Sequence, residues 1–482
     1  MILLGRWVVP VSSPYFENGA VVVEQDKILD FGPSATIQAK YRQHQIRSYP
    51  DAAILPGFVN VHTHLELTVL RGYLENLPFW NWIQKLTRTK YQVLTYDELV
   101  VSALLGAVEA IRAGITTVAD PMDLGASLEA VLTSGLRAVL YQECFSPKEE
   151  EADQVLERLQ RKVEELKEKV NRWPEDALFP ATDQSSSTTP SDTERPHTRL
   201  TLGVSPHAPY TVSRSLFQKV HTYARTQKIP VCIHAAESRA EIQLLEKGLG
   251  PIMQSYRTRG VDWQPPECSP VQYLHRLGVI TDSTLLVHCV HLTDHDYKLI
   301  ESEKASVAHC PKSNWKLGHG YMNLKAMRQR QIRLGLGTDS VASNNNMDLF
   351  EEMRFALFNP SWLEATPAGS GMKASILAFG AEDALRLATL GGAEALGMSS
   401  KIGSIEISKQ ADLVAIDLSQ PHTLPVFSPV TALVLSARAS DVRMTMVGGE
   451  LLLEEGKMQR VSEPMLCRAV EKIREKMLNA PG

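Results

Sequence analysis

The chain has 482 residues, of which 44% are hydrophobic and 22% are charged, and its formal net charge is -5 at pH 7. This composition is that of an ordinary globular protein, and the length allows two or three domains or one large α/β barrel with an accessory part. The weak negative charge argues against a surface that binds nucleic acid or a membrane. The sequence has no apolar run of about 18 residues or more, so we expect no membrane-spanning helix.

Both ends of the chain predict short strands. Residues 1–55 alternate β-branched runs with turns, as in GAVVVEQDKILDFGP (19–33), and residues 401–460 have the same character. We expect the two ends to form one small β-sandwich domain together. The first residues, MILLGRWVVP, lack the long apolar core and the cleavage site of a signal peptide, so they are interpreted as a first strand.

The middle of the chain, residues 56–400, alternates apolar segments with helical patterns. Eight such segments predict buried strands, at 53–62, 114–120, 136–145, 199–207, 229–237, 284–292, 305–311 and 332–340. This alternation predicts an α/β fold of the (β/α)₈ barrel type. A doubly wound open sheet is the alternative, but the glycine-rich phosphate loop that would follow its first strand is missing.

One insertion interrupts the predicted barrel at 148–198. Residues 148–173 predict a charged amphipathic helix, and its apolar stripe is Val155, Leu159, Val163, Leu166 and Val170. The Ser- and Thr-rich residues 181–198 predict a flexible linker. A solvated helix with a linker is the main interpretation, and a lid or an oligomer contact is the alternative. Residues 461–482 predict a C-terminal helix.

Six cysteines are scattered along the chain without a C-x-x-C pair. A chain of this length has no need of disulfides for stability, so we expect reduced thiols and a cytoplasmic location.

Histidines and acids gather where the predicted strands end. They are His62, His64, His207, His234, Glu237, His288, His291, His309 and Asp339. In a barrel, the C-terminal ends of all strands meet at one mouth, where such folds carry their chemistry. Taken singly, a histidine at a strand end is more often a hydrogen-bonded polar residue than a ligand, so the argument rests on the group.

Four of these residues predict a metal site. His62 and His64 alternate on one strand and therefore face the same side. With His234 and Asp339 they offer three imidazoles and one carboxylate, a set that suits one catalytic Zn²⁺. Fe²⁺ and Mn²⁺ stay open, because availability matters as much as ligand type. Such an ion would lower the pKa of its bound water to about 7, giving hydroxide near neutral pH.

Several motifs together resemble the amidohydrolase superfamily. They are PGFVNVHTHLE, SPHAPY, HAAE, HCVHL, HCPKSN and GTDSVASNNNMDLFEEMR, followed by ADLVAIDL near the end. The chain looks most similar to the branch that holds thioadenosine/S-adenosylhomocysteine deaminases, aminofutalosine deaminases, guanine and cytosine deaminases, and triazine chlorohydrolases. The resemblance covers nearly the whole chain.

The resemblance implies a role for each motif residue. His62, His64, His234 and Asp339 match metal ligands, and Glu237 matches the acid that carries protons to the substrate. His288 matches the residue that orients the attacking water, and Asp339 with His288 can take the proton of that water. His207 matches a substrate contact. No lysine ends the fourth strand, where members with two metals carry one, so a single metal is expected.

Glu66, Trp80 and Asn314 are further candidates for substrate contact. Glu66 follows His-x-His directly, and the alternatives are substrate contact or bracing of a metal-binding histidine. The segment after the first strand lacks the acid that adenosine-type deaminases use for ribose hydroxyls. Trp80 and the nearby Trp82 are expected either to anchor a helix in the core or to form an aromatic wall of the pocket. Asn314 is expected to contact the substrate. Asp348 or a neighbouring Asn predicts a helix cap after the eighth strand.

These observations predict a metal-dependent hydrolase of carbon–nitrogen bonds other than peptide bonds. A deaminase that releases ammonia from a purine-like or related heterocyclic amine is the leading interpretation. A chlorohydrolase or a cyclic-amide hydrolase with the same site is the alternative, and a catalytically inactive scaffold is a third. The expected partner is a small heterocyclic substrate, without nucleic acid or membrane, and a homodimer stays open.

Overall fold

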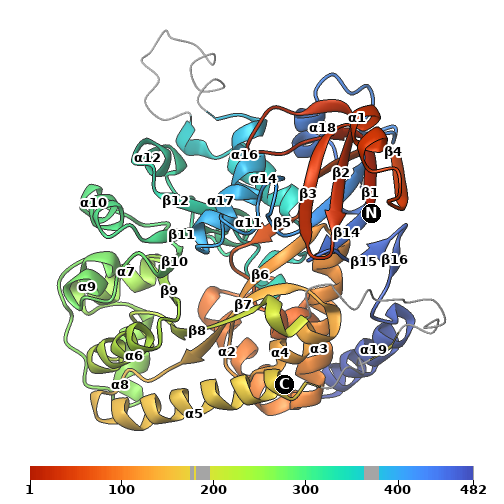
Figure 1. Ribbon diagram of the computed structural model, residues 1–482. Helices are drawn as coiled ribbons and strands as arrows, with labels where there is room; N and C mark the ends of the chain where they lie inside the picture. The colour runs from red at the N-terminus through yellow and green to blue at the C-terminus, as the bar shows by residue number, and fades with distance from the viewer. Residues whose placement is uncertain (174–178, 181–195, 363–378, 481–482) are drawn as a thin grey trace.

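Two eight-stranded sheets organise the chain (Figure 1). The computed structural model describes all residues except 174–178, 181–195, 363–378 and 481–482. One sheet, here called the terminal sheet, combines strands from both ends of the chain, and the other is built from its middle. The predicted β-domain made from both termini and the predicted barrel are therefore both present.

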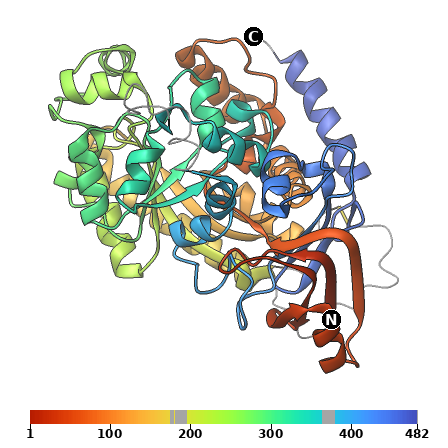
Figure 2. The same ribbon diagram turned by 90° about the horizontal axis from the view of Figure 1, so that it is seen from above.

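The terminal sheet is centred on β4 (Ile46–Pro56), which pairs in parallel with β1 (Ile2–Val8) and antiparallel with β13 (Leu413–Asp417). The two chain ends thus meet at β4, and Figure 2 shows the red and blue strands side by side. Val21 and Ile28 share one apolar cluster with Leu413 and Met444, so a single core extends across strands from both ends of the chain. The remaining strands are β2 (Phe16–Glu24), β3 (Lys27–Pro33), β14 (Val442–Val447), β15 (Glu450–Glu454) and β16 (Lys457–Met458).

The second sheet is a parallel barrel whose strands follow one another in chain order. They are β5 (Phe58–Asn60), β6 (Ile115–Met122), β7 (Arg137–Cys144), β8 (Leu200–Pro206), β9 (Val231–Ala235), β10 (Thr284–His288), β11 (Ser306–His309) and β12 (Arg333–Leu336). The barrel closes where the N–H of Val61 donates to the carbonyl of Leu336 at 3.0 Å and the N–H of Asp339 donates to the carbonyl of His62 at 2.9 Å. Seven of the eight predicted segments contain one barrel strand each, and the segment 114–120 overlaps β6, which runs two residues further to Met122, so the predicted fold is confirmed.

The first predicted segment, 53–62, divides between the two sheets at Gly57. β4 ends at Pro56 and β5 begins at Phe58. A Cβ atom on Gly57 would lie 2.1 Å from the side chain of Thr116, so only glycine fits this crossing. The apolar pattern could not reveal the change of sheet, because both strands are buried.

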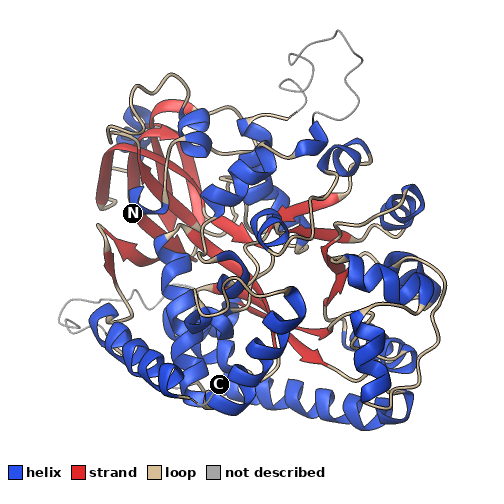
Figure 3. Cartoon of the chain, turned by 180° about the vertical axis from the view of Figure 1, so that it is seen from behind, coloured by secondary structure: helices blue, strands red, loops and turns tan. Residues whose placement is uncertain are grey.

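Helices surround the barrel on its outside (Figure 3). Those with at least two turns are α2 (Phe79–Arg88), α3 (Tyr96–Arg112), α4 (Ala126–Ser134), α5 (Ala152–Asn171), α6 (Arg214–Gln227), α7 (Arg239–Lys247), α8 (Pro251–Thr258), α10 (Asp294–Ser302), α14 (Leu349–Leu357), α16 (Ala381–Ala388) and α19 (Glu463–Asn479). Shorter ones are α9 (Pro270–Arg276), α11 (Pro311–Lys316), α12 (Leu324–Gln329), α13 (Val341–Asn344), α17 (Leu390–Ala395) and α18 (Pro429–Leu435). The short helix α1 (Ser34–Lys40) packs instead against β2 and β3 of the terminal sheet.

Helix α5 differs from the predicted solvated insertion. Of its predicted stripe, Val155, Leu159, Val163 and Leu166 are buried, and Val170 is partly buried against the same core. They join the main core, and α5 packs against β7 and α6. The helix therefore belongs to the outer ring of the barrel, and its many charges cover only the sides that face water. The predicted linker lies outside the described residues, apart from 196–198.

Helix α19 lies within the segment for which a C-terminal helix is predicted, and it packs beside α3 (Figure 1). Its residues Ile473 and Met477 are buried in an apolar cluster with Leu67 and Leu70, which directly follow the first strand of the barrel. No helix in the described part of the chain is long and apolar enough to cross a membrane. All six cysteines are free, and all except Cys467 are buried.

Candidate active site

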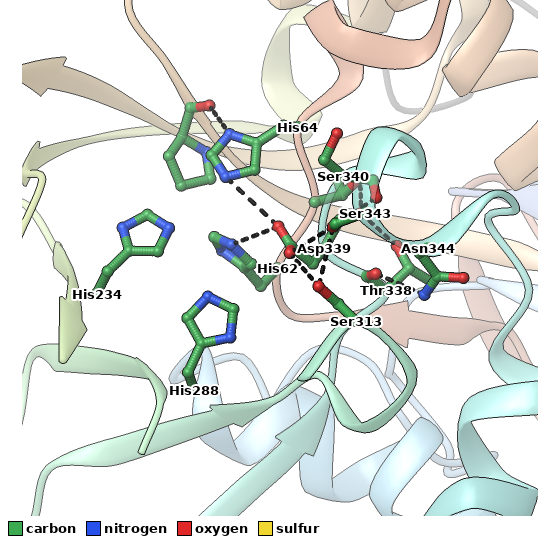
Figure 4. A network of polar contacts seen from close by, with 12 residues as sticks. His62, His64, His234, His288, Ser313, Thr338, Asp339, Ser340, Ser343 and Asn344 are labelled. Carbon is green, nitrogen blue, oxygen red and sulfur yellow. Dashed lines mark hydrogen bonds and ion pairs between the residues drawn. The ribbon is translucent and has the colours of Figure 1, made fainter. Parts of the chain in front are cut away.

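The four predicted metal ligands come together at the C-terminal ends of three barrel strands (Figure 4). His62 and His64 follow β5, His234 lies in β9, and Asp339 follows β12. The ring of His62 is 4.9 Å from that of His64 and 4.9 Å from that of His234, between centres. Asp339 Oδ1 lies 3.4 Å from His62 Nε2 and 3.7 Å from His64 Nε2. His62 is therefore the centre of the group.

The hydrogen bonds of the histidines leave nitrogens free for a metal ion. Nδ1 of His64 contacts the carbonyl of Pro121 at 3.2 Å, and Nδ1 of His234 contacts the carbonyl of His207 at 3.1 Å. Both ring nitrogens of His62 are buried without a hydrogen-bond partner among the described residues. A buried nitrogen without a partner is costly, and a cation would remove that cost. The residues present therefore fit a divalent metal ion.

Burial keeps these imidazoles neutral, which is the form that binds metal. It lowers the pKa of His64 to about 3 and that of His234 well below its ordinary value. Burial alone would raise the pKa of Asp339, but the nearby His62 and His288 hold it well below the usual range. Its other oxygen, Oδ2, accepts from Ser313 at 2.6 Å and Ser343 at 2.8 Å, which leaves Oδ1 directed toward the histidines.

Glu237, the predicted proton carrier, lies between two histidines. Its Oε1 atom is 3.6 Å from His288 Nε2 and 3.4 Å from His319 Nε2. Burial alone would raise the pKa of Glu237, but the nearby His288 and His319 lower it to about 2. The carboxylate is therefore ionised near neutral pH and must receive a proton before it can donate one.

His319 was not among the sequence candidates. It lies in the loop after α11, well beyond the end of the seventh barrel strand, and no strand-end rule reaches that position. Its ring makes a T-shaped contact with that of Phe79 of α2, with 4.8 Å between ring centres. The loop thereby brings a second histidine to Glu237.

His288 is oriented by Asn314 of α11. Its Nδ1 atom lies 2.9 Å from Asn314 Oδ1, and Asn314 is fully buried. The described contact of Asn314 is thus with a histidine, and its predicted contact with substrate stays a prediction.

Four residues near the site have a positive φ although none is glycine. They are Ala236 (54°), His288 (72°), Cys289 (47°) and Asp339 (56°). Such left-handed conformations are uncommon for these residue types and collect at functional sites. Here they turn the chain sharply as β9, β10 and β12 end, so that the side chains point into the mouth of the barrel.

Glu66 belongs to a buried charged group beside the site. Its carboxylate accepts from the N–H of Ala126 at 3.0 Å and pairs with Lys90 Nζ at 2.9 Å. Lys90 also pairs with Asp123. Among the described contacts, Glu66 therefore braces a lysine rather than a metal-binding histidine. Its predicted contact with substrate stays a prediction.

The two neighbouring tryptophans, Trp80 and Trp82, both belong to α2. Trp80 lies in α2, and its side chain is outside the described part of the structure. Trp82 is buried in the apolar cluster that also holds Leu67 and Leu70. Of the two alternatives for this pair, Trp82 supports the core anchor.

His207 directly follows β8 and lies beside the predicted metal ligands. Its ring is 4.6 Å from that of His234, between centres, and its Nδ1 lies 2.9 Å from Thr211 Oγ1. Burial lowers the pKa of His207 to about 4, so the ring is neutral. A carboxylate oxygen of Glu143, near the end of β7, lies within 4.8 Å of ligand nitrogens of both His207 and His234. Glu143 was not a sequence candidate, although the strand-end rule that selected His207 also covers it.

This geometry agrees with the comparisons with known proteins. The sequence model of the amidohydrolase family matches residues 53–452, and the chain belongs to this family. A 5-methylthioadenosine/S-adenosylhomocysteine deaminase of Syntrophobacter fumaroxidans is 31% identical over 446 residues, covering 92% of this chain and 90% of that protein.

Solved structures give the same fold. A zinc-bound adenosine deaminase of Xanthomonas campestris superposes with a TM-score of 0.81 at 27% identity, covering 99% of this chain and 98% of that one. A zinc-bound atrazine chlorohydrolase of Arthrobacter aurescens gives 0.77 at 20% identity, covering 98% and 99%. The second likeness concerns the fold alone.

Proposed function

We propose that this protein is a metal-dependent deaminase that releases ammonia from a purine-like or related heterocyclic amine. The observation that carries the proposal is the position of Glu237, an ionised carboxylate held between His288 and His319 beside the metal-binding group. A deaminase needs such a carboxylate, because an aromatic amine accepts a nucleophile only after a ring nitrogen is protonated. The deaminase relative and the adenosine deaminase structure support the same reaction class.

His62, His64, His234 and Asp339 are proposed to hold one divalent cation, with Zn²⁺ as the first choice. When bound, such an ion makes a water molecule nucleophilic near neutral pH. We propose that Asp339 and His288 accept the proton of the attacking water and that Glu237 delivers a proton to the ring nitrogen. Proton transfer by a positioned side chain contributes about 10²–10⁴-fold to the rate.

An ammonia-release screen tests the proposal. Zinc-loaded protein is incubated with purines, pyrimidines and nucleosides, and we expect ammonia from at least one ring amine. A chlorohydrolase would instead release chloride from a chlorinated triazine without ammonia, and a cyclic-amide hydrolase would open its ring. An inactive scaffold would turn over none of these compounds.

Glu237→Gln tests the role of the carboxylate on the best substrate of that screen. We expect turnover to fall by at least about 10²-fold, while the zinc content stays that of the unmodified protein. Near-normal turnover would contradict the assignment, and loss of zinc would show that the change had damaged the metal site instead.

A homodimer and a cytoplasmic location stay proposals. Light scattering on the purified protein measures the first, and fractionation of the producing cells measures the second.

A further inference from the structure

His319 is a buried histidine of the site to which the proposed chemistry gives no task. Its exposed fraction is 7%, and its Nε2 atom is buried without a partner in ordinary hydrogen-bond geometry among the described residues. Oε1 of Glu237, the proposed proton carrier, lies 3.4 Å from this nitrogen. Contacts between catalytic groups are often this long in a free enzyme and shorten when substrate is bound. The contact between His319 and Glu237 is therefore one that substrate binding can complete.

The C-terminal end of α11 fixes the backbone of His319. The N–H of Gly318 donates to the carbonyl of Trp315 at 3.1 Å. The N–H of His319 donates to the carbonyl of Asn314 at 2.9 Å. These two bonds form a Schellman motif, which needs a left-handed residue just past the helix, usually glycine. Gly318 meets this need with a φ of 73°, so the end of the helix places the next side chain at a defined point.

Apolar packing holds the ring of His319 as well. The ring of Phe79, at the start of α2, makes a T-shaped contact with it. Phe79 and Leu317, which lies two residues before His319, both pack against the apolar cluster that contains Trp82. The loop after α11 and the start of α2 are thereby tied to the same cluster, and the ring is kept beside Glu237.

The carboxylate of Glu237 depends on its neighbours for orientation. Its backbone N–H donates to Glu241 at 2.9 Å, but its side chain ends in a torsion without sharply preferred angles. His288 and His319 both approach the same oxygen, Oε1. His288 also serves the proposed attacking water, which leaves His319 as the neighbour that can serve Glu237 alone.

We propose that His319 is a positioning residue for Glu237, whose Nε2–H holds Oε1 so that the other oxygen, Oε2, meets the ring nitrogen of the substrate. The proposal rests on the proposed function and names the group that aims its proton carrier. An ionised carboxylate only accepts hydrogen bonds, so Nε2 must carry a hydrogen for the two groups to bond. Oε1 can accept from it both before Glu237 takes up a proton and while Oε2 holds that proton.

Two variants separate this role from packing. His319→Leu keeps an apolar side chain beside Phe79 but loses the nitrogen, whereas His319→Gln packs less well but offers an N–H near the position of Nε2. On the best substrate of the ammonia screen, we expect kcat of His319→Leu to fall by about tenfold or more with little change in KM, because Glu237 is misplaced in the transition state. His319→Gln is expected to recover part of this loss, and both variants should keep the zinc content of the unmodified protein.

A measurement without substrate tests the contact itself. Nuclear magnetic resonance is recorded on zinc-loaded protein with ¹⁵N-labelled histidines, and the signal missing from both His319 variants identifies Nε2. We expect this nitrogen to carry a hydrogen, and its signal to move in Glu237→Gln but not in Glu150→Gln, which changes an exposed glutamate. For the kinetics, the exposed His295 of α10 supplies the matched controls His295→Leu and His295→Gln, which should leave kcat and KM unchanged.

The two failures are distinguishable. An unchanged kcat or a loss of zinc in His319→Leu, or a kcat of His319→Gln no higher than that of His319→Leu, would overturn the proposal. An Nε2 without hydrogen, or a signal that stays in place in Glu237→Gln, would overturn it too. If melting curves show His319→Leu to be misfolded, His319→Gln and the Nε2 signal decide. Absence of ammonia from every screened amine would overturn the proposed function, while the Nε2 signal would still decide whether His319 holds Glu237.

Discussion

Ser313 and Asn314 are neighbours in α11, and each holds a different group of the site. Ser313 donates to Asp339 Oδ2 at 2.6 Å, and Asn314 Oδ1 lies 2.9 Å from His288 Nδ1. One buried turn of helix thereby orients both the metal-binding carboxylate and the histidine beside Glu237. Groups that orient a ligand in this way matter nearly as much as the ligand itself.

Asn314→Ala tests whether Asn314 orients His288 or contacts the substrate. We expect kcat to fall by about tenfold, because His288 loses the acceptor that fixes its ring, while KM changes little. Steady-state kinetics on the best substrate of the ammonia screen measures both values, with the exposed Asn171→Ala as control. A raised KM with an unchanged kcat would instead support the substrate contact predicted from the sequence.

Ser313→Ala tests the support of Asp339. The carboxylate keeps the hydrogen bond from Ser343 but loses its shorter one, so we expect zinc affinity to fall by about 10–100-fold. Competition with a chromogenic chelator measures the affinity. Ser302→Ala, which removes an exposed hydroxyl on α10, is expected to change nothing; unchanged affinity in both variants would show that Ser343 suffices.

At the scale of an element, α14 begins at the predicted cap. The carboxylate of Asp348 accepts from the N–H of Phe350 at 2.8 Å. Burial raises the pKa of Asp348 from 3.8 to about 6, and this effect exceeds the opposing one of the hydrogen bond. The folded protein therefore holds this proton more tightly than the unfolded chain does. The resulting stability is fully present below about pH 4 and is lost as the pH rises through about 6.

Asp348→Asn and Asp348→Ala separate the cap from the charge. Asn caps a helix as well as Asp does but does not titrate, so its melting temperature is expected to vary less between pH 4 and 7. Ala loses the cap, and we expect a loss of about 1 kcal/mol in unfolding free energy. Melting curves across this pH range measure both effects, and parallel curves for Asn and the unmodified protein would refute the charge effect.

At the scale of the whole molecule, a buried ion pair joins the two sheets. Arg137 of β7 donates to Asp412 from Nε at 2.7 Å and from a terminal nitrogen at 3.0 Å, and both side chains are buried. Asp412 also accepts from the N–H of Gly448, next to β14. We propose a division into a β-domain of 1–55 with 401–460, a barrel of 56–400 and a terminal helix of 461–482, and this pair crosses its main boundary.

Arg137→Met is expected to destabilise the protein by about 3–5 kcal/mol, because it leaves Asp412 buried without its charged partner. Combining it with Asp412→Asn should restore part of the loss, since the buried charge is then removed. Denaturant unfolding measures both. Arg161→Met, which breaks an exposed pair with Glu165 on α5, is the control and should cost about 1 kcal/mol or less. An equally small loss for Arg137→Met would contradict the proposed role.

Much of this architecture could be predicted because it repeats. Each barrel strand is a buried apolar run, and the same rule places His62, His207, His234 and Asp339 at one mouth. The crossing at Gly57 could not be predicted, since strands buried in different sheets look alike along the sequence. The ring position of α5 was missed because a charged outer face looks the same on an insertion and on a barrel helix.

Contacts between side chains of separate loops could not be predicted from the sequence. His319 reaches Glu237 only because the loop after α11 folds back over the mouth, and Lys90 meets Glu66 and Asp123 across separate elements. No spacing rule links such residues, because their distances in the chain are set by the lengths of connecting segments. The positions of the strand ends therefore predict which residues gather as candidate metal ligands, but they do not predict the side chains that surround those residues.

The central position of β4 in the terminal sheet has a consequence for the folding of the nascent chain during synthesis. As the ribosome proceeds, β1 to β4 emerge first, but β13 lies more than three hundred residues later. One edge of β4 must therefore stay open until almost the entire polypeptide has been made, and pairings so distant in sequence form slowly. This unpaired edge is where a nascent chain of this protein is most exposed to wrong partners, and where a chaperone would serve it best.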